Sequence, residues 1–95
     1  MFEWQIDRPL AVLDIEGTGA NPRVDRIIEL AIVKVMPDGT KEKHVLRINP
    51  EIPIPAEVTA IHGIRDDDVK DCPVFRDVAE KILSILQGCD FGGYN

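Results

Sequence analysis

Cysteine, basic residues and long apolar runs are all scarce in this 95-residue sequence. The two cysteines, Cys72 and Cys89, are too few and too widely spaced for a zinc motif or a disulfide framework, so we expect them in the core or at its boundary. No window approaches the roughly 18 apolar residues of a membrane span. The first residues carry acids where a signal peptide would carry Lys or Arg. We therefore expect a cytoplasmic protein without membrane attachment.

The shortage of basic residues also limits how the chain can meet nucleic acid. Lys and Arg number 11 against 17 Asp and Glu, which gives a net charge of -6. This balance argues against binding through a broad basic surface, because neutralising phosphates needs clustered cations. It does not exclude nucleic acid, since an acidic site loaded with divalent cations presents local positive charge to a phosphate.

The apolar content of 44% is enough for one small hydrophobic core, and the length is too short for two domains. Runs rich in Ile and Val are separated by Pro- and Gly-containing turns, and one later segment has helical periodicity. In order, the sequence predicts strands over residues 10–15, 26–36 and 41–48, short helices over 56–61 and 66–69, a helix from about Pro73 to Gly88, and a strand within 89–95. This order predicts an α/β fold in which the long helix covers one face of a mixed sheet.

The long helix is predicted to bury one apolar stripe. Its polar side chains, Glu80, Lys81, Ser84 and Gln87, fall on the other face. The predicted stripe comprises Val74, Phe75, Val78, Ala79, Ile82, Leu83 and Leu86.

An acid pair ends the first predicted strand. Side chains alternate along a strand, so Asp14 and Glu16 share one face while Leu13 and Ile15 point to the other. Their stems lie roughly 7 Å apart at a rise of about 3.3 Å per residue, which suits carboxylates that grip two ions. Two like charges at a partly buried place favour a cation, and hard oxygen ligands select Mg²⁺ or Mn²⁺.

Two other interpretations of this segment stay open. The acids could be a solvated strand end that simply enters a turn. Alternatively, the Gly17-Thr18-Gly19 turn could cradle a phosphate as in nucleotide-binding α/β proteins, although the sequence lacks Gly-x-Gly-x-x-Gly and a Walker lysine. Glycine removes the Cβ atoms that would keep a substrate away from the backbone, and Thr18 adds a hydroxyl.

The sequence resembles the DnaQ-like, or DEDD, exonucleases, a family that includes the proofreading subunit of the bacterial replicative polymerase. The family's first motif is an apolar strand, Asp-x-Glu-Thr-Thr-Gly, a variable loop and an Ile-Ile-Glu-like second strand. Here it reads LDIEGTGANPRVDRIIELAIVKV. The later segments INPEIPIPAEVTAIHGIRDDDVKDCPVF and FGGYN resemble the family's His-Gly-Ile region and the approach to its second motif.

The resemblance implies a ribonuclease H-like fold and a 3′–5′ exonuclease that releases nucleoside monophosphates with two divalent ions, Mg²⁺ or Mn²⁺. It implies that Asp14 and Glu16 are catalytic metal ligands. The nucleic acid 3′ end, DNA or RNA, would be contacted by Gly17, Thr18, Gly19, Ile61, His62 and Asn95. Gly17 departs from the family, which commonly has Thr there and thus one more hydroxyl.

The family's next metal-binding Asp and its general-base His have no counterpart within residues 1–95. We therefore expect this chain to be the amino-terminal part of one exonuclease domain, an incomplete domain that is inactive alone. The alternative is a nonenzymatic remnant of the fold that binds nucleotide or protein. The resemblance further suggests a DNA polymerase subunit as partner, and an exposed sheet edge suggests self-association.

Overall fold

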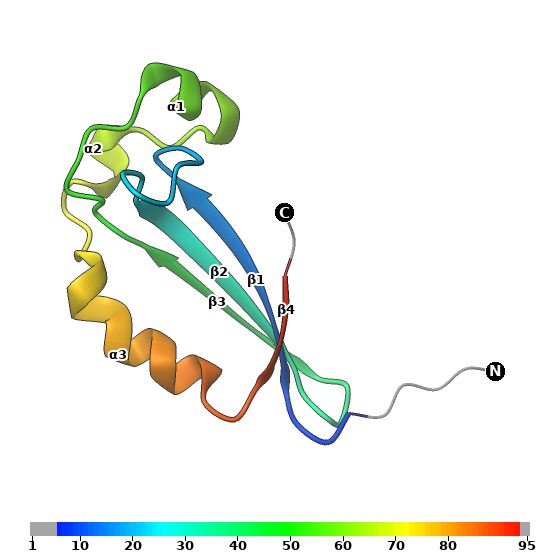
Figure 1. Cartoon of the computed structure of the whole chain (residues 1–95). Helices are drawn as coiled ribbons and strands as arrows, with labels where there is room; N and C mark the ends of the chain where they lie inside the picture. Colours follow the sequence, from blue (N-terminus) through cyan, green and yellow to red (C-terminus); the bar gives the residue numbers. More distant parts are fainter. Residues whose placement is uncertain (1–5, 94–95) are drawn as a thin grey trace.

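The computed structural model describes residues 6–93 and consists of one sheet with helices (Figure 1). The sheet has the order β3-β2-β1-β4, in which β1 pairs antiparallel with β2, β2 pairs antiparallel with β3, and β4 pairs parallel with β1. The elements are β1 (Leu10–Gly17), β2 (Ile27–Val35), β3 (Lys41–Arg47), α1 (Ala56–His62), α2 (Asp66–Val69), α3 (Phe75–Leu86) and β4 (Asp90–Gly93). The predicted mixed α/β fold is confirmed, and the predicted strand ends that fall within residues 6–93 are right to within two residues. The predicted end of the last strand, at residue 95, lies outside the described residues.

The strand β1 lies inside the sheet, and its two sets of alternate residues have different surroundings. Ala11 is fully buried and Leu13 packs against the same core, whereas Asp14 is exposed. The register with β2 places Leu13 opposite Ile32 and Asp14 opposite Ala31. Because residues directly opposite in an antiparallel pair share a face, one face of the sheet is apolar and covered, and the other carries the acids.

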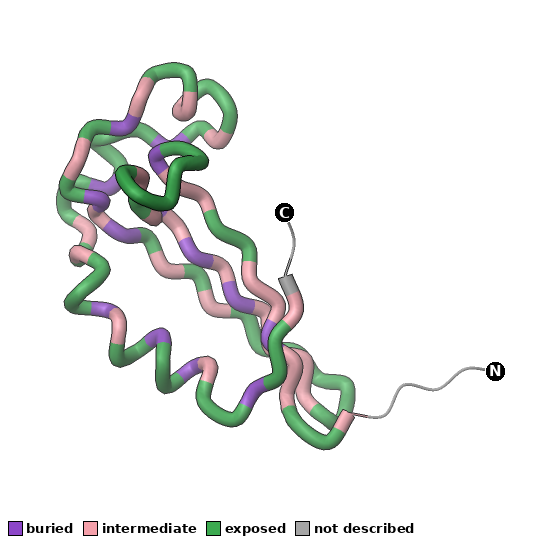
Figure 2. The backbone as a smooth tube through the Cα atoms, viewed as in Figure 1, coloured by how far each residue is buried: buried purple, intermediate pink, exposed green. Residues whose placement is uncertain are grey.

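The helix α3 covers the apolar face. Its buried residues Val78, Ile82 and Ile85 form one cluster with sheet residues such as Leu30 and Ile32. Burying each such side chain is worth about 1.5–3 kcal/mol. Figure 2 marks these buried positions along the helix and the strands.

The predicted helix start and stripe need correction. The helix begins at Phe75, with Val74 at its N-cap, so Pro73 precedes it. Ile85 is buried in place of Leu83, which is 68% exposed, and Phe75 is 45% exposed. The buried face therefore follows a three-to-four residue repeat through Val78, Ile82 and Ile85. Phe75 and Leu83, which the predicted stripe included, lie outside it.

A second buried cluster fixes α1 and α2 beside the sheet. It contains Ile28, Ile54, Ile64 and Val69, with Val58 and Cys72 packed against it. Asp66 is the first residue of α2 and does not cap the helix. Its Oδ1 instead accepts the Ile54 N–H at 2.9 Å, while Asp68 Oδ2 accepts the N–H of the N-cap residue Arg65 at 2.9 Å.

The turn between β2 and β3 is held by an Asp–Thr pair. Asp38 Oδ1 accepts the Thr40 hydroxyl at 2.6 Å and the Thr40 N–H at 2.9 Å. The hydrogen bond from the Thr40 hydroxyl, and secondly that from the Thr40 N–H, lower the pKa of Asp38 below its usual value. Gly39 has φ of 89°, a conformation that L side chains rarely adopt. The turn lies at the end of the sheet opposite to Asp14 and Glu16.

Within residues 6–93, the structure contains no helix that is both long and apolar enough to span a membrane.

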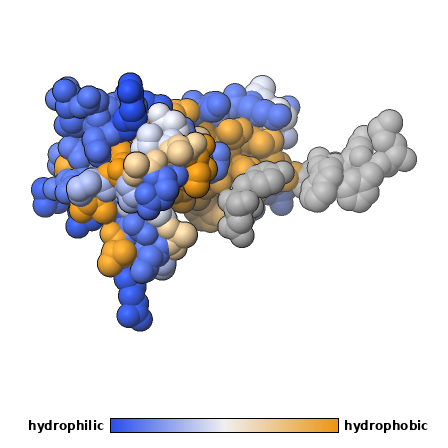
Figure 3. Space-filling model, turned by 90° about the horizontal axis from the view of Figure 1, so that it is seen from above, coloured by the Kyte–Doolittle hydropathy of each residue, from blue (hydrophilic) through white to orange (hydrophobic). Residues whose placement is uncertain are grey.

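Some apolar side chains are exposed on the surface, and Val45 on β3 is 52% exposed. Seen from above, apolar residues gather in the middle of the molecule beside hydrophilic ones (Figure 3).

We predict that Ile82→Ala lowers the free energy of unfolding by about 2–5 kcal/mol, because it leaves a cavity between α3 and the sheet. The exposed Leu83 is the matched control, and Leu83→Ala should change stability by less than about 0.5 kcal/mol. Chemical denaturation followed by circular dichroism measures both. An equal loss for the two variants would contradict the observed helix orientation.

Candidate active site

Asp14 and Glu16 lie at the carboxyl end of β1, on the sheet face opposite α3. Asp14 is exposed and Glu16 is half-buried. The register puts Asp14 opposite Ala31 and Glu16 opposite Glu29. The side-chain direction expected from strand alternation is therefore confirmed, whereas the metal-binding role of these acids stays a prediction.

Glu29 is a third carboxylate that the sequence reasoning missed. Directly opposite residues in an antiparallel pair have Cβ atoms about 4.5–5.5 Å apart, so Glu29 adds negative charge next to Glu16. Arg47, its neighbour on β3, donates from Nε to Glu29 Oε2 at 2.9 Å. This hydrogen bond raises the pKa of Arg47. Glu29 thus carries its own countercharge, whereas no ion pair links Asp14 or Glu16 to a cation within residues 6–93. The Ile-Ile-Glu sequence could have drawn attention to Glu29, but only the register between β1 and β2 shows that this residue lies beside Glu16.

The glycine turn follows a bulge at Glu16 and Gly17 in the β1–β2 pairing. Thr18 is only 1% exposed, and its hydroxyl donates to Asp25 Oδ1 at 2.9 Å and accepts the Arg26 N–H at 2.9 Å. The Thr18 N–H donates to the Arg26 carbonyl at 2.9 Å. The hydroxyl that we predicted to contact nucleotide is therefore already hydrogen-bonded inside the protein.

Internal packing also explains why glycine stands at positions 17 and 19. A Cβ at Gly19 would lie 2.5 Å from Asp25 Oδ2, and a Cβ at Gly17 would lie 3.1 Å from the Arg26 carbonyl oxygen. Gly19 is thus required by the carboxylate packed against it. Substrate contact by Gly17, Thr18 and Gly19 remains a prediction.

His62 joins the end of α1 to the glycine turn. Its Nδ1 accepts the Ile64 N–H at 3.0 Å, so Nε2 carries the proton of the neutral ring and faces the Gly17 carbonyl at 3.3 Å. The neighbouring Ile61 is 84% exposed. Both predicted contact residues of this loop therefore lie on the segment packed next to the end of β1. Asn95 lies outside the described residues.

The other histidine lies away from the acids. His44 is opposite Ile32 in the register and so belongs to the α3 face, where its Nε2 is 3.5 Å from Glu42 Oε1. Among residues 6–93, no group of three or more His, Cys, Asp or Glu is arranged to hold a metal ion. Asp14 and Glu16 offer carboxylate oxygens of the kind that Mg²⁺ and Mn²⁺ prefer, and their role as metal ligands stays a prediction.

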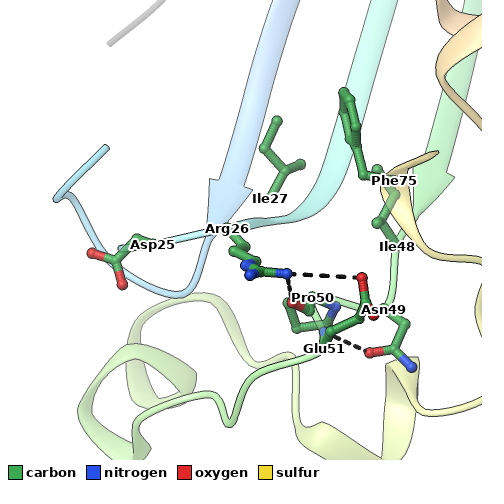
Figure 4. Close-up of a pocket in the computed structure, with 8 residues that line it drawn as sticks. All are labelled: Asp25, Arg26, Ile27, Ile48, Asn49, Pro50, Glu51 and Phe75. Carbon is green, nitrogen blue, oxygen red and sulfur yellow. Dashed lines mark hydrogen bonds and ion pairs between the residues drawn. The ribbon is translucent and has the colours of Figure 1, made fainter. Parts of the chain in front are cut away.

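A cavity of about 280 Å³ lies near the glycine turn but does not include the acid pair (Figure 4). Arg26 lies at its polar side, 3.5 Å from the Pro50 carbonyl oxygen and 3.7 Å from Glu51 Oε1. Glu51 has φ of 63° and donates its N–H to Asn49 Oδ1 at 2.8 Å. The Asp25 carboxylate points away from the other lining residues. The lining residues are Asp25, Arg26, Ile27, Ile48, Asn49, Pro50, Glu51 and Phe75.

Known proteins are similar to this chain in sequence and in fold. DNA polymerase III PolC-type from Caldanaerobacter subterraneus is 32% identical over 93 residues, which cover 98% of this chain and 7% of that protein. The DNA polymerase III subunit epsilon of Rickettsia prowazekii is 35% identical over 77 residues, 79% of this chain and 34% of that subunit. The structure of exonuclease X in complex with 5′ overhanging duplex DNA aligns with a TM-score of 0.67 at 31% identity, over 77% of this chain and 42% of that one.

The chain thus spans about a third or less of these two relatives. The sequence profile of the RNase T exonuclease family matches residues 11–95, which include both acids, the glycine turn and every element from β2 to β4. The resemblance to DnaQ-like exonucleases is confirmed, and the sheet is a partial ribonuclease H-like domain. The chain belongs to the RNase T exonuclease family.

Proposed function

We propose that the chain is part of a metal-dependent 3′–5′ exonuclease domain that hydrolyses phosphodiester bonds and releases nucleoside monophosphates from nucleic acid 3′ ends. The observation that carries this proposal is the position of Asp14 and Glu16, side by side on the open face of the sheet, in a chain of an exonuclease family. Two Mg²⁺ or Mn²⁺ ions would be held in part by these carboxylates.

The charge around the pair supports a cation there. Glu29 is paired with Arg47, whereas Asp14 and Glu16 take part in no ion pair within residues 6–93, so their negative charge is not balanced by a neighbouring side chain. A phosphate would be repelled by this charge unless cations intervene. When bound, the ions would offset charge on the phosphate oxygens during hydrolysis. Asp14 and Glu16 would fix where those ions lie.

The substrate contacts are proposed from their place around the acids. Ile61 offers an apolar side chain that is 84% exposed, and His62 and the glycine turn lie at the end of the same strand as the acids. Exonuclease X is described with duplex DNA, which favours DNA as the nucleic acid bound here. The similarity to epsilon and PolC-type polymerases favours a DNA polymerase subunit as partner.

A nonenzymatic, nucleotide- or protein-binding role is the second candidate, because neither histidine of the chain is placed to act as a general base. Both ring nitrogens of His62 have backbone partners, and His44 lies on the opposite face of the sheet. A general base must reach the proton it removes, directly or through one water. We therefore propose that the 95 residues alone are inactive.

We predict that the chain binds Mn²⁺ weakly and that Asp14→Ala weakens binding by more than about tenfold, or about 1.4 kcal/mol. Isothermal titration calorimetry measures this, with Asp77→Ala as a control that makes the same charge change on the exposed side of α3. An unchanged titration for Asp14→Ala would remove Asp14 from the site.

We predict that the isolated chain with Mg²⁺ or Mn²⁺ digests a labelled single-stranded oligonucleotide no faster than its Asp14→Ala variant. The reason is the missing general base and the incomplete ligand set. Gel analysis of a time course is sufficient. Robust digestion from the 3′ end that Asp14→Ala abolishes would mean that these 95 residues form a complete catalyst.

We also propose self-association through β4, which pairs with β1 alone in the described part of the chain. Its free edge lies beside exposed apolar side chains, since Phe91 is 63% exposed and lines a cavity with Leu83 and Leu86. We predict a concentration-dependent dimer in sedimentation experiments and a monomer for Phe91→Asp. Val45→Asp on the opposite edge strand, β3, is the control. A wild-type chain that stays monomeric at every concentration would contradict this proposal.

A further inference from the structure

We infer that Thr18 and Asp25 form a positioning pair that fixes the end of β1, and with it the direction of Glu16. The inference rests on the proposed function, because it gives Asp25 the task of supporting the metal-binding acids from outside the metal site. Asp25 lies on the loop before β2 and was not among the predicted site residues.

The Thr18 hydroxyl is the centre of the pair. A hydroxyl has one proton to donate and lone pairs to accept, and this one donates to Asp25 Oδ1 and accepts the Arg26 N–H, both at 2.9 Å. Thr18 is 1% exposed, so removing the hydroxyl would leave the Arg26 N–H without this partner in a place with little access for water.

Asp25 is equally committed to internal partners. Its second oxygen, Oδ2, accepts the Asn21 N–H at 2.8 Å, and the Asn21 carbonyl accepts the Asp25 N–H at 2.8 Å. Gly19 packs directly against the same carboxylate. The carboxylate therefore closes the loop between Gly19 and Arg26, and both of its oxygens are used in doing so.

The pair follows directly after the bulge in β1, so it can affect the direction of the Glu16 side chain. The β1–β2 pairing has its bulge between Glu16 and Gly17, and bulges redirect the neighbouring side chains. Past this bulge, Thr18 and Arg26 are joined by a backbone hydrogen bond and by the Thr18 hydroxyl. His62 contacts the Gly17 carbonyl as well. The turn is thus tied to β2 and to α1, immediately after the acid.

The test compares Thr18→Val, which keeps the shape but removes the hydroxyl, with Thr18→Ser, which retains it. We expect Thr18→Val to weaken Mn²⁺ binding about tenfold in calorimetry at a temperature where the variant is folded, because one buried donor loses its partner. Thr18→Ser should stay within about twofold of the wild type. Thr40→Val is the matched control, since it removes a hydroxyl bonded to Asp38 at the far end of the sheet.

A second measurement tests, without metal, whether the turn after β1 stays hydrogen-bonded to the segment before β2. Amide hydrogen exchange at Thr18 and Arg26 should accelerate about tenfold in Thr18→Val and not in Thr18→Ser or Thr40→Val. If the wild type binds no Mn²⁺, the proposed function fails, and exchange alone decides the inference. Unchanged exchange and unchanged Mn²⁺ affinity in Thr18→Val would overturn it. Loss of Mn²⁺ binding in Asp25→Asn with intact binding in Thr18→Val would also overturn it, because Asp25 would then be a ligand.

Discussion

The pairing register between β1 and β2 is the constraint on which the other features depend. It sets Leu13 against Ile32 on the face that α3 covers and Glu16 against Glu29 on the open face. A slip of one residue would move the acids into the core and the apolar residues into solvent. Burial of Ala11 and Ile32 therefore also determines where the carboxylates lie, so that the core and the candidate site are specified by the same strand.

The open face carries its acids at one end and lysines toward the other, since Lys43 and Lys41 on β3 lie opposite Val33 and Val35. Arg47 neutralises Glu29, and the two remaining acids lie at the strand end where the chain turns away. Because carboxylates that lack a nearby countercharge attract divalent cations, the electrostatics agree with the family membership. The net charge of -6 gives no overall attraction for a polyanion, so the proposed binding of nucleic acid would depend on local charge at the site.

Much of the fold could be predicted from the sequence, because each strand is bounded by Gly or Pro and each face follows a period of two. The side-chain direction of Asp14 and Glu16 followed from the same alternation. The placement of Glu29 and Asp25 could not, since both depend on which residues of β1 and β2 lie opposite each other. Likewise, Leu83 and Ile85 have similar hydrophobicity, and only the angle at which α3 packs on the sheet decides which of them is buried.

The position of β4 beside β1 has a consequence for how the chain folds. The ion pair between Arg8 and Asp90 joins residues 82 positions apart, whereas β1, β2 and β3 are joined to one another by short connections. Closing a long loop costs more chain entropy than closing a hairpin, and distant pairings slow folding. The three antiparallel strands can thus assemble first and serve as the template on which α3 docks. Only then does β4 find its parallel partner β1, so this edge of the described sheet forms after the antiparallel strands.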